Sequence, residues 1–153
     1  MSQDHPYIET IKQYYHGCNT ADTELIKSTF TDDVVHYFTH HKPVRGAEKL
    51  ATYWVKMQPR VNGFWAVDHG LVQGDEAVVE WTMRWTPAGQ KKPQLVRGSE
   101  WYVFREDRIA VVVLEVVGAV HAPQDGAEDA ALVAGETREG EAEKAAPGTC
   151  ARL

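Results

Sequence analysis

Residues 14–38 read YYHGCNTADTELIKSTFTDDVVHYF, and this stretch contains the end of one helix, a short second helix and a strand. Asp22 is a suitable N-cap, because its side-chain oxygen can accept from the free N–H groups of a first helical turn. The helix that it opens is expected to end near Phe30, where residues 31–33 (TDD) break it. The β-forming residues 34–38 (VVHYF) then predict a strand.

Helical periodicity continues on both sides of this stretch. Apolar residues upstream recur at the spacing of one helix face, which predicts a helix over residues 5–18. They are Ile8, Ile11, Tyr15 and Cys18, with Tyr14 beside the stripe. Downstream, Gly46 opens a third helix that is expected to stop before Pro59. Its apolar face consists of Ala47, Leu50, Trp54 and Met57.

The second half of the chain predicts strands separated by turn signals. The expected strands are 64–72, 77–85, 95–104 and 109–117. The first two are joined by the hairpin signal 73–76 (QGDE), and the last two by the tight turn 105–108 (REDR). Helices followed by a meander indicate the α+β class. We expect three N-terminal helices packed on a strongly curved antiparallel sheet, forming a cone with an apolar pocket.

Composition excludes several classes of protein. The 153 residues carry 22 acidic and 16 basic side chains, a net charge of −6, which disfavours a nucleic-acid partner. No apolar run is long enough to span a membrane, and the N-terminal residues do not resemble a signal peptide. Cys18 and Cys150 do not make a disulfide framework, so we expect a cytoplasmic location.

The C-terminal residues 122–153 differ from the rest of the chain. They include nine alanines and four glycines, and three basic against seven acidic residues, so that this segment has a net charge of −4. Such a composition buries too little apolar area to offset the entropy of ordering, which predicts a disordered acidic tail. One folded domain is therefore expected over residues 1–121.

The order of elements and several local strings resemble the nuclear-transport-factor-2-like superfamily. Besides residues 14–38, the strings are 45–48 (RGAE), 72–79 (VQGDEAVV) and 98–104 (GSEWYVF). This superfamily includes SnoaL-like polyketide cyclases, scytalone dehydratase and ketosteroid isomerase. The resemblance implies the cone-shaped fold over residues 5–121. It implies less about function, because one fold hosts many activities.

Comparison with ketosteroid isomerase implies roles for particular residues. Tyr14 matches the oxyanion-binding tyrosine of that enzyme, and Glu100 matches its protonated carboxylic acid. Phe38 stands where the general-base aspartate is expected, and a phenylalanine cannot accept a proton. Steroid isomerisation by the same mechanism is therefore not expected.

Strand alternation identifies His36 as one substitute base. It lies two residues from Phe38 on the same strand and shares its face, whereas Val35 and Tyr37 face outward. Imidazole titrates near neutral pH, which suits proton transfer. The competing interpretation is a structural histidine whose ring nitrogens are satisfied by neighbouring groups.

The same alternation predicts an aromatic-walled cavity. The expected substrate-binding side chains are Phe38, Trp54, Trp81, Met83, Trp85 and Tyr102, with Leu114 and Val116 added by the family resemblance. Glu100 shares this apolar face, where an unpaired carboxylate costs several kcal/mol. The alternative is an ion pair of Glu100 with Arg84, Arg97 or Arg105.

Asp68 and His69 form a second candidate pair. On a regular strand only one of them faces the cavity, although a bulge relaxes this restriction. We favour Asp68, because a second carboxylate in a different environment would complement Glu100. The sequence itself does not decide between them.

The predicted site uses no metal and no cofactor. His36, His40 and His41 lie within six residues, but the last two are adjacent in a polar loop and are not expected to converge on one ion. Val111, Val113, Trp101 and Tyr37 are expected to form an apolar strip on the convex face, which predicts a homodimer.

Three functions fit these patterns. The leading hypothesis is a cofactor-independent acid–base enzyme acting on a small hydrophobic cyclic or aromatic carbonyl compound. Its predicted catalytic residues are Tyr14, His36, Asp68 and Glu100. The alternatives are a non-catalytic domain that binds small molecules and a dimeric protein-interaction module.

Overall fold

The computed structural model describes residues 5–39 and 41–117. The segment 122–153 lies outside these residues, so its expected disorder stays a prediction. His40 also lies outside them.

The first two helices have side-chain caps at their N-termini, of which the sequence predicted the second. α1 (Pro6–Thr20) begins with proline at its first position, and the side chain of His5 accepts a hydrogen bond from the Tyr7 amide at 3.2 Å. α2 (Thr23–Ser28) is capped by Asp22, whose Oδ1 accepts from the Leu25 amide at 3.0 Å. Both helices are confirmed, with bounds within two residues of those expected.

The third helix, α3 (Ala47–Val61), runs past Pro59, so the prediction that it stops before this residue is wrong. Proline lacks one amide donor, but it lies within the last turn, where that loss is small. The helix ends at Asn62, which adopts φ 44° and donates its amide to the Gln58 carbonyl at 2.8 Å.

Six strands form one sheet in the order β2-β1-β6-β5-β4-β3. Their bounds are β1 (Phe30–Tyr37), β2 (Val44–Arg45), β3 (Phe64–Gln73), β4 (Glu76–Trp85), β5 (Gln94–Arg105) and β6 (Arg108–Val117). β3 to β6 make the predicted antiparallel meander. We expected an antiparallel sheet, but β1 lies parallel to β6, so the sheet is mixed.

Two local predictions near β1 are corrected. Residues 31–33 were expected to lie between helix and strand, but β1 already begins at Phe30, with an irregular register between Phe30 and Val35. The two-residue strand β2 was not predicted at all. It pairs with β1, and a pairing of this length leaves no periodic signal in the sequence.

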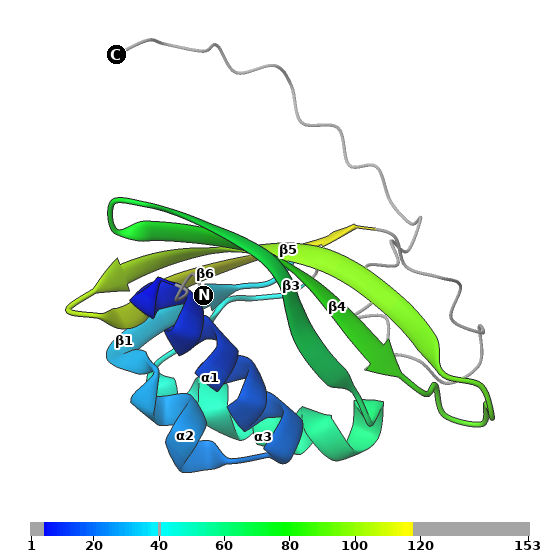
Figure 1. Ribbon diagram of the computed structural model, residues 1–153. Helices are drawn as coiled ribbons and strands as arrows, with labels where there is room; N and C mark the ends of the chain where they lie inside the picture. The colour runs from blue at the N-terminus through cyan, green and yellow to red at the C-terminus, as the bar shows by residue number, and fades with distance from the viewer. Residues whose placement is uncertain (1–4, 40, 118–153) are drawn as a thin grey trace, which may run out of the picture.

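The three helices lie together on one side of the curved sheet, whose other face is not covered by any described element (Figure 1). The core lies between these two layers. Burial along β5 alternates as predicted, with Val96, Gly98, Glu100, Tyr102 and Phe104 directed toward the helices. The α+β class and the cone-shaped arrangement are therefore confirmed.

Within the described residues, no helix is long and apolar enough to cross a membrane.

Candidate active site

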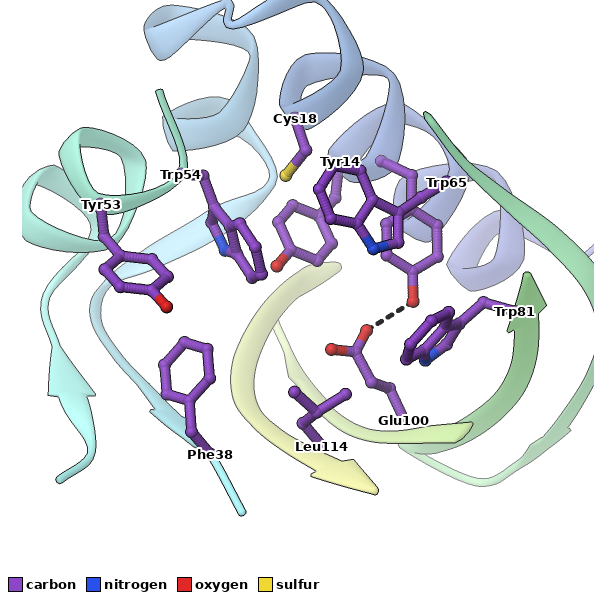
Figure 2. A pocket seen from close by; sticks show the side chains of 10 residues that line it. Tyr14, Cys18, Phe38, Tyr53, Trp54, Trp65, Trp81, Glu100 and Leu114 are labelled. Carbon is purple, nitrogen blue, oxygen red and sulfur yellow. Dashed lines mark hydrogen bonds between the residues drawn. The ribbon is translucent and has the colours of Figure 1, made fainter. Parts of the chain in front are cut away.

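A pocket lies between the concave face of the sheet and helices α1 and α3 (Figure 2). It encloses about 440 Å³ of space that atoms do not fill, including its opening to solvent. Most of its wall is aromatic, since it is lined by Tyr14, Tyr15, Cys18, Phe38, Tyr53, Trp54, Trp65, Trp81, Glu100 and Leu114.

Glu100 projects from β5 into this pocket and is only 3% exposed. Its Oε2 accepts a hydrogen bond from the Tyr15 hydroxyl at 2.5 Å and another from the Tyr102 hydroxyl. Two donors to one carboxylate oxygen compensate part of the cost of burying this group. Glu100 thus lies where strand alternation predicted.

Tyr15 was not among the predicted catalytic residues. It projects from α1 and is 5% exposed. Burial raises the pKa of Tyr15 well above its usual value, and the nearby Glu100 carboxylate raises it further. The sequence did contain a signal for it, because Tyr15 belongs to the buried stripe of the first helix, whereas Tyr14 lies beside that stripe.

Tyr14 lines the pocket as expected, but the hydroxyl groups that donate to Glu100 are those of Tyr15 and Tyr102. Burial raises the pKa of Tyr14 well above its usual value, with smaller contributions from Cys18 and Glu100. The pKa of the Cys18 thiol is also raised by burial. At neutral pH the phenol and the thiol therefore stay protonated, and Tyr14 remains a hydrogen-bond donor.

His36 is completely buried on β1, and its Nε2 lies 3.5 Å from Oε1 of Glu100. Its imidazole stacks on the ring of Phe38, with 3.9 Å between ring centroids. Phe38 lines the pocket, whereas His36 is not among the lining residues. The predicted shared face of the two residues is confirmed, but His36 lies behind the pocket wall.

Asp68 does not reach the pocket, so the prediction that it faces the cavity is wrong. β3 contains the bulge that would allow this, since its register shifts between Val67 and His69. Regular alternation from Trp65 and Val67 nevertheless leaves Asp68 exposed, where its Oδ2 accepts a hydrogen bond from Thr82. His69 is exposed as well. Because Thr82 donates to it at the surface, the Asp68 carboxylate has a hydrogen-bond partner without being removed from solvent.

Four of the predicted substrate-binding residues line the pocket, namely Phe38, Trp54, Trp81 and Leu114. Met83, Trp85 and Tyr102 are buried on the same face of the sheet but do not contribute to the lining. The side chain of Val116 lies outside the described part of the structure. The prediction missed Tyr53 and Trp65, which are supplied by α3 and β3.

The alternative ion pairs of Glu100 are not formed. Arg105 contacts Asp33, and Arg84 and Arg97 are exposed. Over residues 5–39 and 41–117, no group of three or more His, Cys, Asp or Glu side chains could hold a metal ion. The ionisable side chains that remain at the pocket are therefore Glu100, the tyrosines and Cys18, with His36 behind them.

Two indole groups at the pocket lack a partner. The Nε1 atoms of Trp54 and Trp81 are buried and make no hydrogen bond within the described structure. A buried donor without an acceptor is costly, and in native proteins it commonly marks a place where water or a ligand binds. The pocket can thus offer indole and phenol donors to oxygen atoms of a guest, beside one carboxylate.

Comparison with known proteins identifies the family. The sequence model of the SnoaL-like domain matches residues 11–112. A comparison with curated proteins found no match.

Solved structures also resemble this chain. A protein of unknown function with a cystatin-like fold from Methylobium petroleophilum PM1 is 25% identical, with a TM-score of 0.64, over 92% of this chain and 96% of that one. A provisionally named SnoaL-like polyketide cyclase from Jannaschia sp. CCS1 is 16% identical, with a TM-score of 0.64, over 75% and 91%. A protein with a ketosteroid isomerase-like fold from Catenulispora acidiphila DSM 44928, solved with trimethylamine, is 12% identical, with a TM-score of 0.66, over 72% and 87%. The family match covers more than half of the chain, and the chain therefore belongs to the SnoaL-like domain family.

Proposed function

We propose that this protein is a cofactor-independent acid–base enzyme that acts on a small hydrophobic cyclic or aromatic carbonyl compound. The observation that carries the proposal is the buried carboxylate of Glu100, which lines an aromatic pocket and has His36 at 3.5 Å. Perturbed environments of this kind are typical of groups that transfer protons. The names of related polyketide cyclases support the same class of chemistry.

The geometry changes the roles expected from the sequence. With Asp68 on the outer surface and His36 behind Phe38, Glu100 is the group that can exchange a proton with a guest. Tyr14 is suited to donate to the substrate oxygen, because it lines the pocket and the hydroxyl groups that hold Glu100 belong to Tyr15 and Tyr102. In this reaction Glu100 removes a proton next to the carbonyl group, and Tyr14 stabilises the negative charge that develops on oxygen.

Isomerisation, dehydration and aldol-type cyclisation all begin with such a step. A test therefore need not assume which of them follows. Cyclic ketones and 1,3-diketones, including tetralones and 1,3-cyclohexanedione derivatives, would be incubated with the protein in D₂O. NMR would then measure deuterium incorporation next to the carbonyl. We expect Glu100→Gln to lower the exchange rate by about 10²–10⁴-fold, the usual contribution of a general base.

Asp68→Asn is the matched control, because it removes a carboxylate that lies outside the pocket. Its exchange rate should stay within about twofold of the unchanged protein. Equal rates for Glu100→Gln and the unchanged protein would overturn the proposal. Quenching of tryptophan fluorescence by the same ketones without any exchange would favour the alternative, a domain that only binds them.

We also propose that the protein is a homodimer that assembles through the outer face of the sheet. Apolar side chains of this face lie side by side across its strands: Tyr37 pairs with Val113, Val113 with Trp101, Trp101 with Val78, and Val78 with Leu71. All of them are exposed except Val78, which is half-buried. Phe64 and Leu95 add exposed apolar area at the far end of the same face. A second copy is the occupant proposed, because the same face exposes both acidic and basic side chains, which two copies can pair with each other: Glu80, Glu115, Arg84 and Arg97. We propose a cytoplasmic location as well, which the low cysteine content of the sequence favours.

A further inference from the structure

We propose that Tyr15 and Tyr102 are positioning residues that hold Oε2 of Glu100, so that Oε1 is the atom that exchanges the proton. This inference rests on the proposed acid–base function. It goes beyond that function in two ways. It assigns different tasks to the two carboxylate oxygens, and it gives Tyr15 and Tyr102 a role that the family resemblance does not imply.

The contacts of the two carboxylate oxygens are unequal. Oε2 accepts from Tyr15 at 2.5 Å and also from Tyr102. A carboxylate oxygen has about two lone-pair sites, so these donors use its capacity. The polar contact described for Oε1 is with Nε2 of His36 at 3.5 Å, which is longer than a good hydrogen bond. Oε1 therefore keeps acceptor capacity for a substrate proton.

The two tyrosines approach Glu100 from different elements. Tyr102 lies two residues further along β5 and therefore on the same face of the strand, whereas Tyr15 comes from α1. Their hydroxyl groups also contact each other, with 3.2 Å between the oxygens. Donors that are fixed to both layers of the fold restrain rotation of the carboxylate. Such restraint keeps a catalytic group near its productive orientation.

Both hydroxyl groups stay protonated under working conditions. Burial raises the pKa of Tyr15 and of Tyr102 well above the usual value, and the Glu100 carboxylate raises both further. Each tyrosine can therefore donate throughout neutral pH. Neither is expected to give up its proton during the reaction, so they act through Glu100 and not on the substrate.

The proton balance of the step is simple. The carbon–hydrogen bond next to the carbonyl breaks, its proton binds to Oε1, and its electron pair moves onto the carbonyl oxygen as an enolate. Protonated Oε1 then returns a proton to the substrate at a carbon or at a leaving oxygen. The carboxylate is regenerated with Oε2 bonded to both tyrosines throughout.

Tyr15→Phe and Tyr102→Phe test this assignment, since each removes one hydroxyl group and keeps the ring. With the ketone panel in D₂O, we expect each variant to lower the maximal exchange rate about tenfold, as loss of a hydrogen bond to a charged group does. KM should not change, because Oε2 does not contact the substrate. The pH–rate profile would be recorded for each variant as well and should differ from that of the unchanged protein.

The double variant should lose more than either single variant, since one tyrosine can partly hold Oε2 alone. Tyr7→Phe is the matched control, because Tyr7 stacks on Phe104 with 3.9 Å between ring centroids and makes no described contact with Glu100. It should change neither the rate nor the profile. A rise in KM with an unchanged maximal rate for Tyr15→Phe or Tyr102→Phe would overturn the assignment.

A second readout separates this inference from the proposed function. Glutamate labelled with ¹³C at its carboxyl carbon would be incorporated, and the Glu100 signal identified by its absence in Glu100→Gln. Loss of either hydroxyl should move the chemical shift of this signal, because the carboxylate loses a hydrogen-bond donor, whereas Tyr7→Phe should not. If no ketone exchanges but these changes in chemical shift appear, the proposed function fails, and the inference that the two tyrosines hold Oε2 is retained. If the chemical shift stays unchanged in both variants, the inference is wrong whatever the activity.

Discussion

Nε2 of His36 lies 3.5 Å from Oε1 of Glu100, while the ring of Phe38 separates the imidazole from the pocket. The histidine is fully buried, and within the described structure neither ring nitrogen makes a hydrogen bond. His36 thus reaches a bound molecule only through the carboxylate. Its position fits a residue that tunes and orients Glu100, not a base that contacts substrate.

His36→Asn should therefore weaken proton exchange without weakening substrate binding. We expect the maximal exchange rate to fall about tenfold to a hundredfold, with KM unchanged and an altered pH–rate profile. The control is His41→Asn, because His41 stacks on Phe38 at 4.0 Å between centroids but does not contact Glu100. Exchange rates and profiles that agree for both variants and the unchanged protein would show that His36 is only structural.

Stability should depend on pH in the alkaline range. Tyr14, Tyr15 and Tyr102 have pKa values raised well above the usual 10.0, mainly by burial. Their protonated forms are stabilised by folding, so this stability is fully present below about pH 10. It is lost as pH rises beyond that, because the unfolded chain releases these protons first.

Urea denaturation at several pH values would measure the effect. The free energy of unfolding should fall above about pH 10, and each raised tyrosine adds about 1.4 kcal/mol per pH unit to that slope. Tyr102→Phe should reduce the slope, whereas Tyr7→Phe, which removes a hydroxyl from a tyrosine that is only partly buried, should not. Equal slopes for the two variants would contradict this assignment.

Gly98 provides the space in which the Trp81 indole lies. The two residues pair across β4 and β5, and a Cβ on Gly98 would come within 2.3 Å of Cζ2 of Trp81 and 2.7 Å of the Glu115 carbonyl oxygen. Gly98→Ala should lower the free energy of unfolding by about 1–3 kcal/mol, as overpacking does. Trp81 lines the pocket, so tryptophan fluorescence should change as well.

Urea denaturation and emission spectra would test this expectation. Ser99→Ala, one residue away on the outer face, is the control and should have an effect within about 0.5 kcal/mol. An equal loss in both variants would mean that contact with Trp81 is not the cause.

The proposed homodimer predicts a change of mass in solution. Trp101→Asp with Val113→Asp places two charges in the centre of the exposed apolar row on neighbouring strands β5 and β6. We expect this variant to sediment as a monomer where the unchanged protein sediments as a dimer, because buried unpaired charges are strongly unfavourable.

Analytical ultracentrifugation would measure both species. Lys91→Glu with Lys92→Glu changes charges in the loop between β4 and β5, away from the apolar row, and should leave the dimer intact. A monomeric unchanged protein, or a dimeric double-aspartate variant, would refute the proposed interface.

Local patterns were enough to predict most elements of this fold. Hydrophobic spacing identified three helices and four strands of the meander, because the burial period differs between helix and strand. Strand alternation placed Glu100, His36 and Phe38 on the concave face, as the structure does. The two-residue strand β2 and the continuation of α3 through Pro59 were missed, since both depend on contacts made after the chain folds.

The partners of the inward side chains could not be obtained in the same way. Alternation states the face of a residue but not its neighbour on another element. The resemblance to ketosteroid isomerase paired Glu100 with Tyr14, although the hydroxyl groups that reach it belong to Tyr15 and Tyr102. Asp68 faces solvent by regular alternation from Trp65 and Val67, and the bulge that follows turns His69 outward as well. No residue pattern indicates this bulge.

The sequence by itself thus determined the class of the fold, the face of most strand residues and the presence of one carboxylate on an apolar wall. These properties follow from periodicity and from the cost of burying charge, which act locally. Only the tertiary structure decided that Tyr15, Tyr102 and His36 meet at Glu100, and that β1 lies parallel to β6. The physical reason is that helix packing and strand register bring together residues far apart in the chain, and hydrogen bonds and ion pairs form only between atoms so placed.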